Sequence, residues 1–463
     1  MLNPAEVVAL AAELLPQYRA ELERLDLIDR YLKGDHAPPY TPKAASREYR
    51  LLARRARTNL LPLVVDGMAQ ALYLGGYTRS DGTPGGGWKY WQANKLDARQ
   101  TAIHRASLSY GTSYTVTTLG ADPLTGTAMP VIRGVSPRRM IAAYENPGED
   151  DWPLYVLRVD PDRTGKVWRL RVYDDSHVYR LTVDHNGDRP EYLDARPHGA
   201  PLCPVVAFPD VPDLEGRVRG QVEPLIDLQD RVNQTVFDLL VAQSFSSFKI
   251  RYATGMAPEV DAQGNAKPLP VDARRLLMAA DPDTRFGQLD ETALGPLLES
   301  GDAAMRHMAV VSQTPSTDLL GQLVNLSADA IAQARDGQSR KRIEHEHVYG
   351  ESWEQTLQLA ASIAGDAEGA AETAAEVRWR DMEARSLAQI VDALGKAATM
   401  LGIPPEALWS RIPGVTQTEV DEWKTLRRDG DPMAALADSL DRQARTTAGV
   451  NDGGNTGGPG GAH

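Results

Sequence analysis

VRGQVEPLIDLQDRVNQTVFDLLVAQ at residues 218–243 and LGPLLESGDAAMRHMAVVSQTP at residues 294–315 are the two stretches that decide the fold. In the first, apolar residues recur at helical spacing. Pro224 fits at the start of this helix, because the first amide of a helix has no hydrogen-bond partner that proline could remove. The second repeats this spacing and stops before Pro315, since proline disfavours a helical residue ahead of it. The two stretches predict a pair of long helices that flank a separate segment.

The segment between the two helices is expected to contain β structure. Residues 247–252 and 276–280 predict short strands. At about 1.5 Å per residue the first helix spans about 30 Å, so this excursion lies far from the layer in which the helix starts. After the second helix, a short loop is expected as far as residue 326.

The N-terminal region is predicted to combine helices with a sheet. Asn3 and Glu6 form a capping box, Pro16 predicts an interruption of the helix that follows, and Gly34 suits a left-handed C-terminal cap. Between residues 112 and 208 apolar and polar residues alternate, which predicts a mostly antiparallel sheet stacked on the N-terminal helices. The expected fold class is therefore α+β.

A longer helix is expected from Ser327 to about Gly365, in which either of two glycines permits a bend, although a straight helix fits nearly as well. His345 and His347 lie two positions apart on this helix and therefore point in different directions, so that one metal ion cannot easily bind both. We expect a solvated or ion-paired surface at both histidines.

The C-terminal part is expected to be helical and then unstructured. A short strand is predicted at residues 376–380, and three short helices at 385–401, 405–411 and 418–428. The last residues are dominated by Gly, Asn and Thr and are too poor in apolar side chains to pack.

Composition limits the possible functions. At 463 residues the chain is long enough for more than one core. A net charge of -13 disfavours a regulator that grips DNA phosphates, but it suits a channel through which DNA slides, if acidic groups line the channel. Cys203 is the only cysteine, so no intramolecular disulfide can form, and a reducing compartment is indicated. Its side chain is predicted to be buried as a small hydrophobic residue. Neither a signal peptide nor a membrane span is predicted.

No pattern of catalytic, metal-binding or cofactor-binding residues is present in the sequence. The acidic runs at 149–151 and 281–283 lie in predicted loops, where a solvated loop is favoured over a cation or nuclease site. Arginines cluster between Arg47 and Arg57, and a solvated helix face or an ion-pair belt between subunits is favoured over a nucleic-acid contact. The sequence therefore predicts a protein that is not an enzyme and that has no cofactor and no metal.

The order of the predicted elements resembles a known family. Helix, β excursion, helix, loop and long helix are similar to the stem, clip, stem, tunnel loop and kinked helix of the portal proteins, or head-to-tail connectors, of tailed double-stranded DNA bacteriophages. Short stretches that match this family follow one another in the same order along the chain: Asp29–His36, Asn59–Tyr77, Ala106–Tyr114, Val135–Pro137, Pro204–Phe208, Leu228–Asn233 and Asn325–Ala330.

The resemblance implies a division of the chain into named parts. These are an N-terminal wing at 1–217, a first stem helix at 218–245, a clip at 246–290, a second stem helix at 291–313, a tunnel loop at 314–326, a kinked long helix with a return to the wing at 327–380, a helical crown at 381–440 and a disordered tail at 441–463.

The resemblance also implies a function. Copies of the chain would form a dodecameric ring at one vertex of the capsid, as the channel for packaging and ejection of double-stranded DNA. The implied partners are the large terminase, the major capsid and scaffolding proteins, and the head-completion or adaptor proteins, with no membrane contact. The protein would belong to the virion and reside in the host cytoplasm during assembly.

Residues 315–325 are predicted to project into the channel. They contain a single charged residue and several apolar ones, so they would touch DNA without the attraction that Lys or Arg creates. An equally favoured alternative is that these leucines pack beneath the long helix. The candidate channel residues are Thr317, Asp318, Leu319, Leu320, Gln322 and Asn325.

A second candidate site lies in the clip, where basic residues stand out in an acidic protein and would dock the packaging motor or an adaptor. These residues are Lys249, Arg251, Arg274 and Arg275. Two other classes of protein fit the sequence less well. A packaging-motor ATPase or nuclease is disfavoured by the missing motifs, and a non-ring minor head protein does not explain paired helices around a β excursion.

Overall fold

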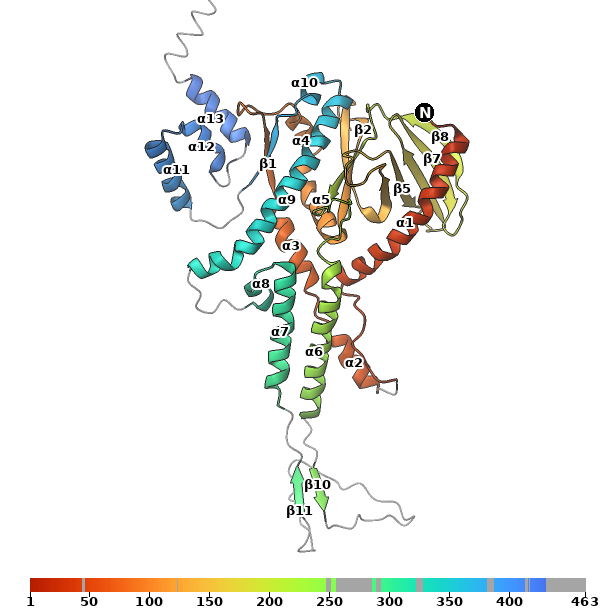
Figure 1. The fold of residues 1–463 in the computed structure, drawn as a ribbon, viewed down its shortest axis with the longest axis vertical. Coiled ribbons are helices and arrows are strands. Elements are labelled where there is room, and N and C mark those ends of the chain that lie inside the picture. Colours follow the sequence, from red (N-terminus) through yellow and green to blue (C-terminus); the bar gives the residue numbers. More distant parts are fainter. Residues whose placement is uncertain are drawn as a thin grey trace, which may run out of the picture. The chain divides into compact units, whose positions relative to one another are not determined.

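The computed structural model describes residues 1–43, 46–122, 124–246, 251–254, 285–288, 293–321, 328–380, 387–412, 415 and 417–429. The chain divides into two compact units, whose elements are drawn in Figure 1. Unit 1 comprises Met1–Leu22, Asp66–Gly220 and Lys341–His463; unit 2 comprises Glu23–Val65 and Gln221–Arg340. Helices α1 (Pro4–Leu32), α3 (Leu61–Ala71) and α9 (Ala328–Ile363) contribute residues to both units.

A five-stranded antiparallel sheet forms one part of unit 1. Its strands, in the order in which they pair, are β4 (Met140–Ala143), β5 (Tyr155–Pro161), β6 (Val167–Tyr173), β7 (His177–Asp184) and β8 (Glu191–Pro197). Trp168, Leu170 and Val172 of β6 are buried while Arg169 between them is exposed, as the alternating pattern predicts. This alternation gives the sheet one apolar face.

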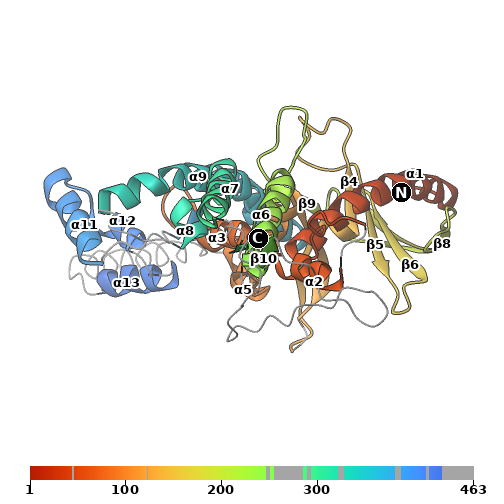
Figure 2. The same cartoon turned by 90° about the horizontal axis from the view of Figure 1, so that it is seen from below.

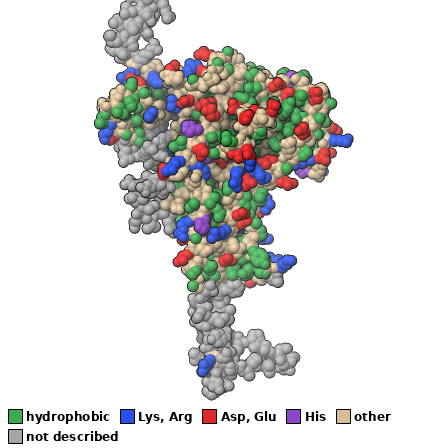
Figure 3. All heavy atoms as spheres, in the orientation of Figure 1, with side chains coloured by type: hydrophobic (Ala, Val, Ile, Leu, Met, Phe, Trp, Pro, Cys, Tyr) green, Lys and Arg blue, Asp and Glu red, His purple; other side chains and the backbone are tan. Residues whose placement is uncertain are grey.

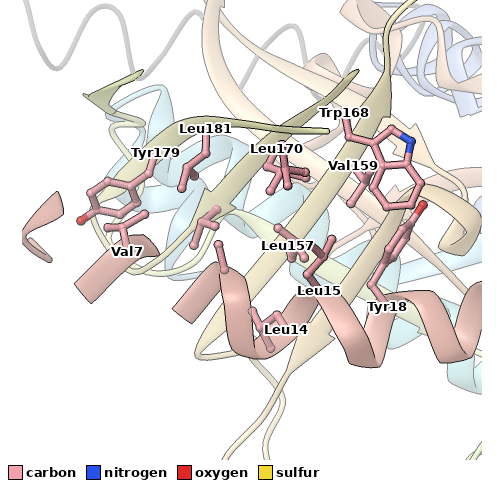
Figure 4. Packing of buried hydrophobic residues seen from close by; sticks show 13 residues of the cluster. Val7, Leu14, Leu15, Tyr18, Leu157, Val159, Trp168, Leu170, Tyr179 and Leu181 are labelled. Carbon is pink, nitrogen blue, oxygen red and sulfur yellow. The ribbon is translucent and has the colours of Figure 1, made fainter. Parts of the chain in front are cut away.

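Helix α1 covers the apolar face of this sheet. Figure 4 shows Leu14, Leu15 and Tyr18 pointing from the helix toward Leu157 and Leu170 of the strands. This packing also explains why the predicted interruption at Pro16 is wrong. The proline removes one backbone hydrogen bond, but buried side chains on both sides of it hold the helix on the sheet.

Both ends of α1 agree with the sequence prediction. The backbone N–H of Asn3 donates to Glu6 Oε2 at 2.8 Å, and the N–H of Glu6 donates to Asn3 Oδ1 at 3.0 Å, so the capping box is confirmed. Gly34, just after the helix, has φ +78°, the left-handed conformation that its position requires.

A second sheet of unit 1 packs against two helices that also contact each other. β3 (Ala128–Val135), β2 (Thr112–Ala121) and β9 (Val205–Pro209) pair in this order, and α5 (Leu96–Tyr110) packs on them. On α9, Trp353 contacts Phe208 of β9 at a ring distance of 4.8 Å. Short elements of this part are η1 (Pro137–Arg139), α4 (Trp88–Ala93) and α10 (Ala367–Ala370).

The return of the chain after the long helix forms a two-stranded pair. β12 (Glu376–Trp379) pairs antiparallel with β1 (Leu74–Thr78), which confirms the strand predicted at 376–380. The helices predicted beyond it are also confirmed. They are α11 (Leu387–Leu401), α12 (Pro405–Leu408) with η3 (Trp409–Arg411), and α13 (Gln417–Asp429). The tail predicted at 441–463 lies outside the described residues.

Unit 2 contains the two helices predicted first. They are α6 (Ile226–Ser246), preceded by η2 (Glu223–Leu225), and α7 (Gly295–Ser312), and both views in Figures 1 and 2 show them side by side. The remaining elements are α2 (Arg47–Arg55), α8 (Ser316–Leu320), β10 (Arg251–Thr254) and β11 (Arg285–Gln288).

The β excursion exists, but its strands are displaced from their predicted positions. Arg251 pairs with Gln288 and Thr254 pairs with Arg285 in an antiparallel ladder. The predicted strand at 247–252 overlaps only the start of β10, and residues 276–280 lie outside the described residues. The residue at which a strand begins or ends depends on the strand with which it pairs, and the local sequence of one strand does not identify that partner.

The predicted α+β class is confirmed by these helices and antiparallel sheets. In the described part of the chain, no helix combines the length and apolarity needed to cross a membrane.

Candidate functional site

The antiparallel pair α6–α7 packs through a narrow apolar seam. Ala304 and Met308 of α7 are buried, and a Cβ built at Gly301 would lie 3.8 Å from Thr235 Cγ2 of α6, whereas Phe237 of α6 packs with Ala53 and Ala56 on the side of α2. The small alanine lets the two backbones approach, since side chains at the contact set the distance between helices. Across the pair, Arg231 Nη1 donates to His307 Nδ1 at 3.3 Å.

The outer surface of this pair is acidic. The three helices α6, α7 and α8 together contain six acidic and two basic side chains. The acidic ones are Asp227, Asp230, Asp238, Glu299, Asp302 and Asp318, and the basic ones are Arg231 and Arg306. Asp227, Asp238, Glu299 and Asp318 are exposed. Arg231 and Arg306 are exposed as well, so four exposed carboxylates against two exposed arginines leave a net negative charge, which repels phosphate groups on average.

A buried polar cluster holds the start of α6 in unit 2. Tyr31 Oη donates to Asp230 Oδ2 at 2.8 Å, and Asn233 Nδ2 donates to His36 Nδ1 at 2.9 Å. His36 Nε2 in turn lies 2.9 Å from the carbonyl oxygen of Tyr31, so this nitrogen is the one that carries the proton.

The segment at residues 58–60 joins the same cluster. Thr58 N–H donates to Asn233 Oδ1 and Leu60 N–H donates to Gln229 Oε1, each at 3.0 Å. Asn59 Nδ2 donates to the carbonyl oxygen of Leu32 at 2.9 Å. Three of the stretches that carry the family resemblance, near residues 31, 59 and 230, therefore meet here. The local pattern of each stretch gives no sign that the three touch.

The segment predicted as a channel loop begins with a helix. Helix α7 ends at Gln313 in the left-handed conformation, with φ +55°, and Pro315 then starts α8. Thr317 and Leu320 are half-buried, Asp318 is exposed, and Leu319 is only 7% exposed. The prediction of a loop is therefore wrong for 316–320, because Leu319 finds an apolar contact that stabilises one helical turn. Gln322 and Asn325 lie outside the described residues.

The candidate clip residues are only partly placed. Arg251 is the first residue of β10, opposite Gln288. Lys249, Arg274 and Arg275 lie outside the described residues. The structure therefore does not test the predicted docking site.

The prediction of a solvated or ion-paired surface is correct for His347 but wrong for His345. His347 is exposed, whereas His345 is 1% exposed and its Nε2 lies 2.5 Å from Asp210 Oδ1. Its Nδ1 lies 2.7 Å from the carbonyl oxygen of Lys341, which can only accept. Both imidazole nitrogens thus face acceptors, so the pair consists of an imidazolium with a carboxylate or of an imidazole with a carboxylic acid.

This buried pair continues along α9 as a polar stripe. Tyr349 Oη donates to Ser107 Oγ at 2.9 Å, and Trp353 Nε1 donates to His104 Nε2 at 2.9 Å. Burial lowers the pKa of His104 to about 3, so this imidazole is neutral and accepts the indole hydrogen. The stripe fixes α9 on α5 by complete hydrogen bonding and leaves no acid–base pair open to a substrate.

Other candidate chemistry is not supported. Cys203 is 3% exposed, and burial raises the pKa of its thiol to about 12, which confirms the buried hydrophobe and disfavours a nucleophile. Among the residues with a described position, no group of three or more His, Cys, Asp or Glu side chains is placed to hold a metal ion.

Comparison with known proteins gives matches over most of the chain. A model of the family described as phage portal protein, SPP1 Gp6-like, matches residues 12–433. The portal protein of Mycobacterium phage D29 is 23% identical over 394 residues, covering 81% of this chain and 79% of that protein. The portal protein of Mycobacterium phage L5 is 22% identical over 350 residues, covering 72% of this chain and 71% of that protein.

A solved structure is also similar to this chain. It is a chain from the neck of an empty GTA particle computed with C6 symmetry, with a TM-score of 0.45 and 13% identity, covering 79% of this chain and 96% of that one.

Proposed function

The chain belongs to the phage portal protein family, SPP1 Gp6-like, and on this premise we propose that its copies form a dodecameric ring at one capsid vertex. Double-stranded DNA passes through the ring during packaging and ejection. The ring also docks the large terminase, the major capsid and scaffolding proteins, and the head-completion proteins. In this proposal the chain is a structural component without catalytic activity.

The observation that best supports a channel is the acidic surface of the α6–α7 pair. The helices α6, α7 and α8 carry four exposed carboxylates against the exposed Arg231 and Arg306; the arginines of α2, which packs on α6, are not part of this pair. If the pair lines the bore, phosphates are repelled from its wall and the duplex slides without binding. A protein that held DNA in place would need the opposite charge.

The segment that follows α7 is proposed to reach the bore with the exposed Asp318, the half-buried Thr317 and Leu320, and the residues after them, including Gln322 and Asn325. Leu319 is buried within the chain and is proposed to hold α8 in place. For Leu319 we therefore favour the alternative given in the sequence analysis, in which the leucine packs inside the chain and does not project into the channel.

The clip is proposed to bind the packaging motor through Lys249, Arg251, Arg274 and Arg275. Reversing two of these charges, with Arg274→Glu and Arg275→Glu, is expected to lower the affinity for the terminase at low salt by at least tenfold, and less at high salt, because surface attraction is screened. Titration of labelled terminase measures this, and an unchanged affinity contradicts the proposed docking site.

The ring itself is tested by native mass spectrometry of the purified full chain with negative-stain images beside it. A closed ring of dodecameric mass with a central hole supports the proposal, and a monomer at micromolar concentration contradicts it. An ATPase assay on the same sample tests the alternative class, because a packaging-motor enzyme would hydrolyse ATP and a structural ring would not.

A further inference from the structure

Helix α2 of unit 2 has two faces of opposite character. Its apolar face packs around Phe237 of α6 through side chains at helical spacing, which are Tyr49, Leu52, Ala53 and, just after the helix, Ala56. The rings of Tyr49 and Phe237 meet nearly at a right angle, with their centroids 5.2 Å apart. Ser46 Oγ accepts the backbone N–H of Tyr49 at 3.2 Å and so caps the helix. The apolar face and the cap hold α2 in place.

The opposite face of α2 is cationic. It carries four exposed arginines, which are Arg47, Arg50, Arg54 and Arg55. Leu51, which is 48% exposed, lies among them. Positions 47, 50, 51 and 54 follow one another within four residues, so their side chains form one row along the helix, and Arg55 flanks it beside Leu51. We call the four arginines the α2 arginine row. Figure 3 shows blue side chains on the surface over α2.

The α2 arginine row is not neutralised within the described part of the chain. Arg57, two positions further along, pairs with Asp35 at 3.4 Å, whereas none of the four arginines has an acidic partner among the described residues. Glu48 is the one carboxylate of α2, and it stands in the first turn, where the helix dipole favours it. Four arginines against one glutamate leave a net charge of +3 on this helix.

The row is directed away from the α6–α7 pair. On α6, Thr235 lies at Gly301 of α7, whereas Phe237 lies at α2. Two positions along a helix turn the side chain by about 200°, so α7 and α2 pack on opposite sides of α6, as Figures 1 and 2 also show. The arginines occupy the face of α2 that is turned away from α6. If the pair lines the bore, the row therefore faces outside the bore.

The chemistry of the row suits phosphate groups. A guanidinium presents two parallel N–H donors, which match the two oxygens of a phosphate. At 1.5 Å per residue the row spans about 10 Å, and a duplex of that length carries about six phosphates. At physiological salt, charges more than about 8 Å away are largely screened. The negative charge elsewhere on the chain therefore does not cancel a direct contact at the row.

The exposed carboxylates of the α6–α7 pair fit the row less well. An ion-pair belt between copies of the chain would need an acidic face without cations. On α6, Arg231 follows Asp227 by four positions, and on α7, Arg306 follows Asp302 by four positions. Side chains four positions apart share a helix face, so each acidic face of the pair contains an arginine that would repel the row.

We propose that the α2 arginine row binds the phosphate backbone of duplex DNA outside the bore. The inference rests on the proposed function for the source of this DNA, which is the genome that the ring admits. Binding is independent of base sequence, because contacts to phosphates carry no sequence information. The acidic pair then lets DNA slide while α2 holds DNA at a separate surface.

A covalently closed DNA circle tests this contact, because a closed circle cannot thread a closed ring. The probe is a fluorescently labelled closed minicircle, titrated with the full chain and followed by anisotropy at about 50 and 200 mM salt. The row variant carries Arg47→Gln, Arg50→Gln and Arg54→Gln. We expect its affinity for the circle to fall by about tenfold or more at the lower salt. The slope of log Kd against log salt falls by about 2 to 3, because three phosphate contacts are lost.

A matched control separates this contact from net charge. Arg163→Gln, Arg169→Gln and Arg189→Gln remove the same charge at three exposed arginines of unit 1 that have no acidic partner among the described residues. This variant is expected to bind the circle as the wild type does, and both variants are expected to keep the circular-dichroism melting curve. An equal loss of affinity in the two variants overturns the assignment to α2.

The remaining outcomes separate this inference from the proposed function. Wild-type rings that leave the circle unbound at the lower salt overturn the DNA contact alone. A row variant that forms no rings in native mass spectrometry, where the wild type does, assigns the arginines to a neighbouring copy and overturns the contact with DNA. A wild-type chain that forms no ring contradicts the proposed function, and the arginine–phosphate contact is then supported if that chain binds the circle and the row variant does not.

Discussion

At the scale of single residues, two histidines on α9 show how position decides chemistry. His345 and His347 are two residues apart, yet His345 is buried against Asp210 while His347 is exposed. Burial of an ion pair contributes little by itself, but removal of one partner leaves a buried charge without compensation. The pair therefore specifies where α9 lies on unit 1.

Replacement of His345 is predicted to be strongly destabilising. His345→Ala removes the hydrogen-bond partner of the buried Asp210 side chain in either protonation state of the pair, and we expect a loss of about 3 kcal/mol in the free energy of unfolding. His347→Ala on the same helix is the matched control, with a change within about 0.5 kcal/mol. Chemical denaturation followed by circular dichroism measures both, and equal effects of the two changes contradict the assignment.

Glu354 predicts a pH dependence of stability. Burial, assisted by Glu351 and Glu376, raises the pKa of this carboxyl from 4.5 to about 7, although the backbone N–H of Val377 donates to it. The folded chain therefore keeps a proton that the unfolded chain releases above pH 4.5. It follows that stability falls as pH rises from 4.5 through 7.

Glu354→Gln should remove this loss, because the amide stays neutral and can accept the same hydrogen bond. Since Glu354 is partly exposed, solvent screening reduces the effect to about 1 kcal/mol. We expect the variant to melt higher than wild type at pH 8 and equally at pH 4.5, as measured by thermal unfolding across pH. Glu191→Gln, at an exposed site, should shift neither curve; a wild-type curve flat between pH 4.5 and 8 would argue against a raised pKa.

At the scale of elements, the neighbouring residues Leu319 and Leu320 of the short helix α8 are expected to have different roles. Leu319 is 7% exposed and stabilises the turn after α7, whereas Leu320 is half-buried. Leu319→Ser is expected to cost about 2 kcal/mol of stability because it places a hydroxyl in an apolar contact.

Leu320→Ser is expected to leave stability and rings intact but to reduce the amount of DNA packaged in an in vitro packaging assay. Normal packaging by Leu320→Ser would place this side chain away from the bore.

At the scale of the whole molecule, charge is distributed unevenly over an acidic chain. Four exposed carboxylates lie on α6, α7 and α8, while exposed arginines gather on α2, which packs on α6. An uneven distribution of this kind places cationic surface on a chain whose net charge of -13 is repulsive toward DNA on average. The net charge alone disfavours a protein that grips DNA and suits a channel, but it does not show where on the chain the charges lie.

The sequence by itself determined the elements whose signals are local. Helical spacing and proline positions located α6 and α7 within a few residues, alternation located β6 and β7, and Asn3 with Glu6 located the start of α1. Each of these signals involves residues within a few positions of one another, so no knowledge of the rest of the chain is needed.

Only the tertiary structure decided what depends on distant partners. His345 and Asp210 are 135 positions apart, and neither neighbourhood indicates the other. Pro16 remains in a continuous helix because α1 packs on a sheet that begins more than a hundred residues later. The hollow of about 890 Å³ lined by Leu10 and Leu14 of α1 and Val348 of α9 likewise exists only once loops and helices from separate parts of unit 1 come together. Burial and pairing are properties of the packed chain, and they override local preference wherever the two conflict.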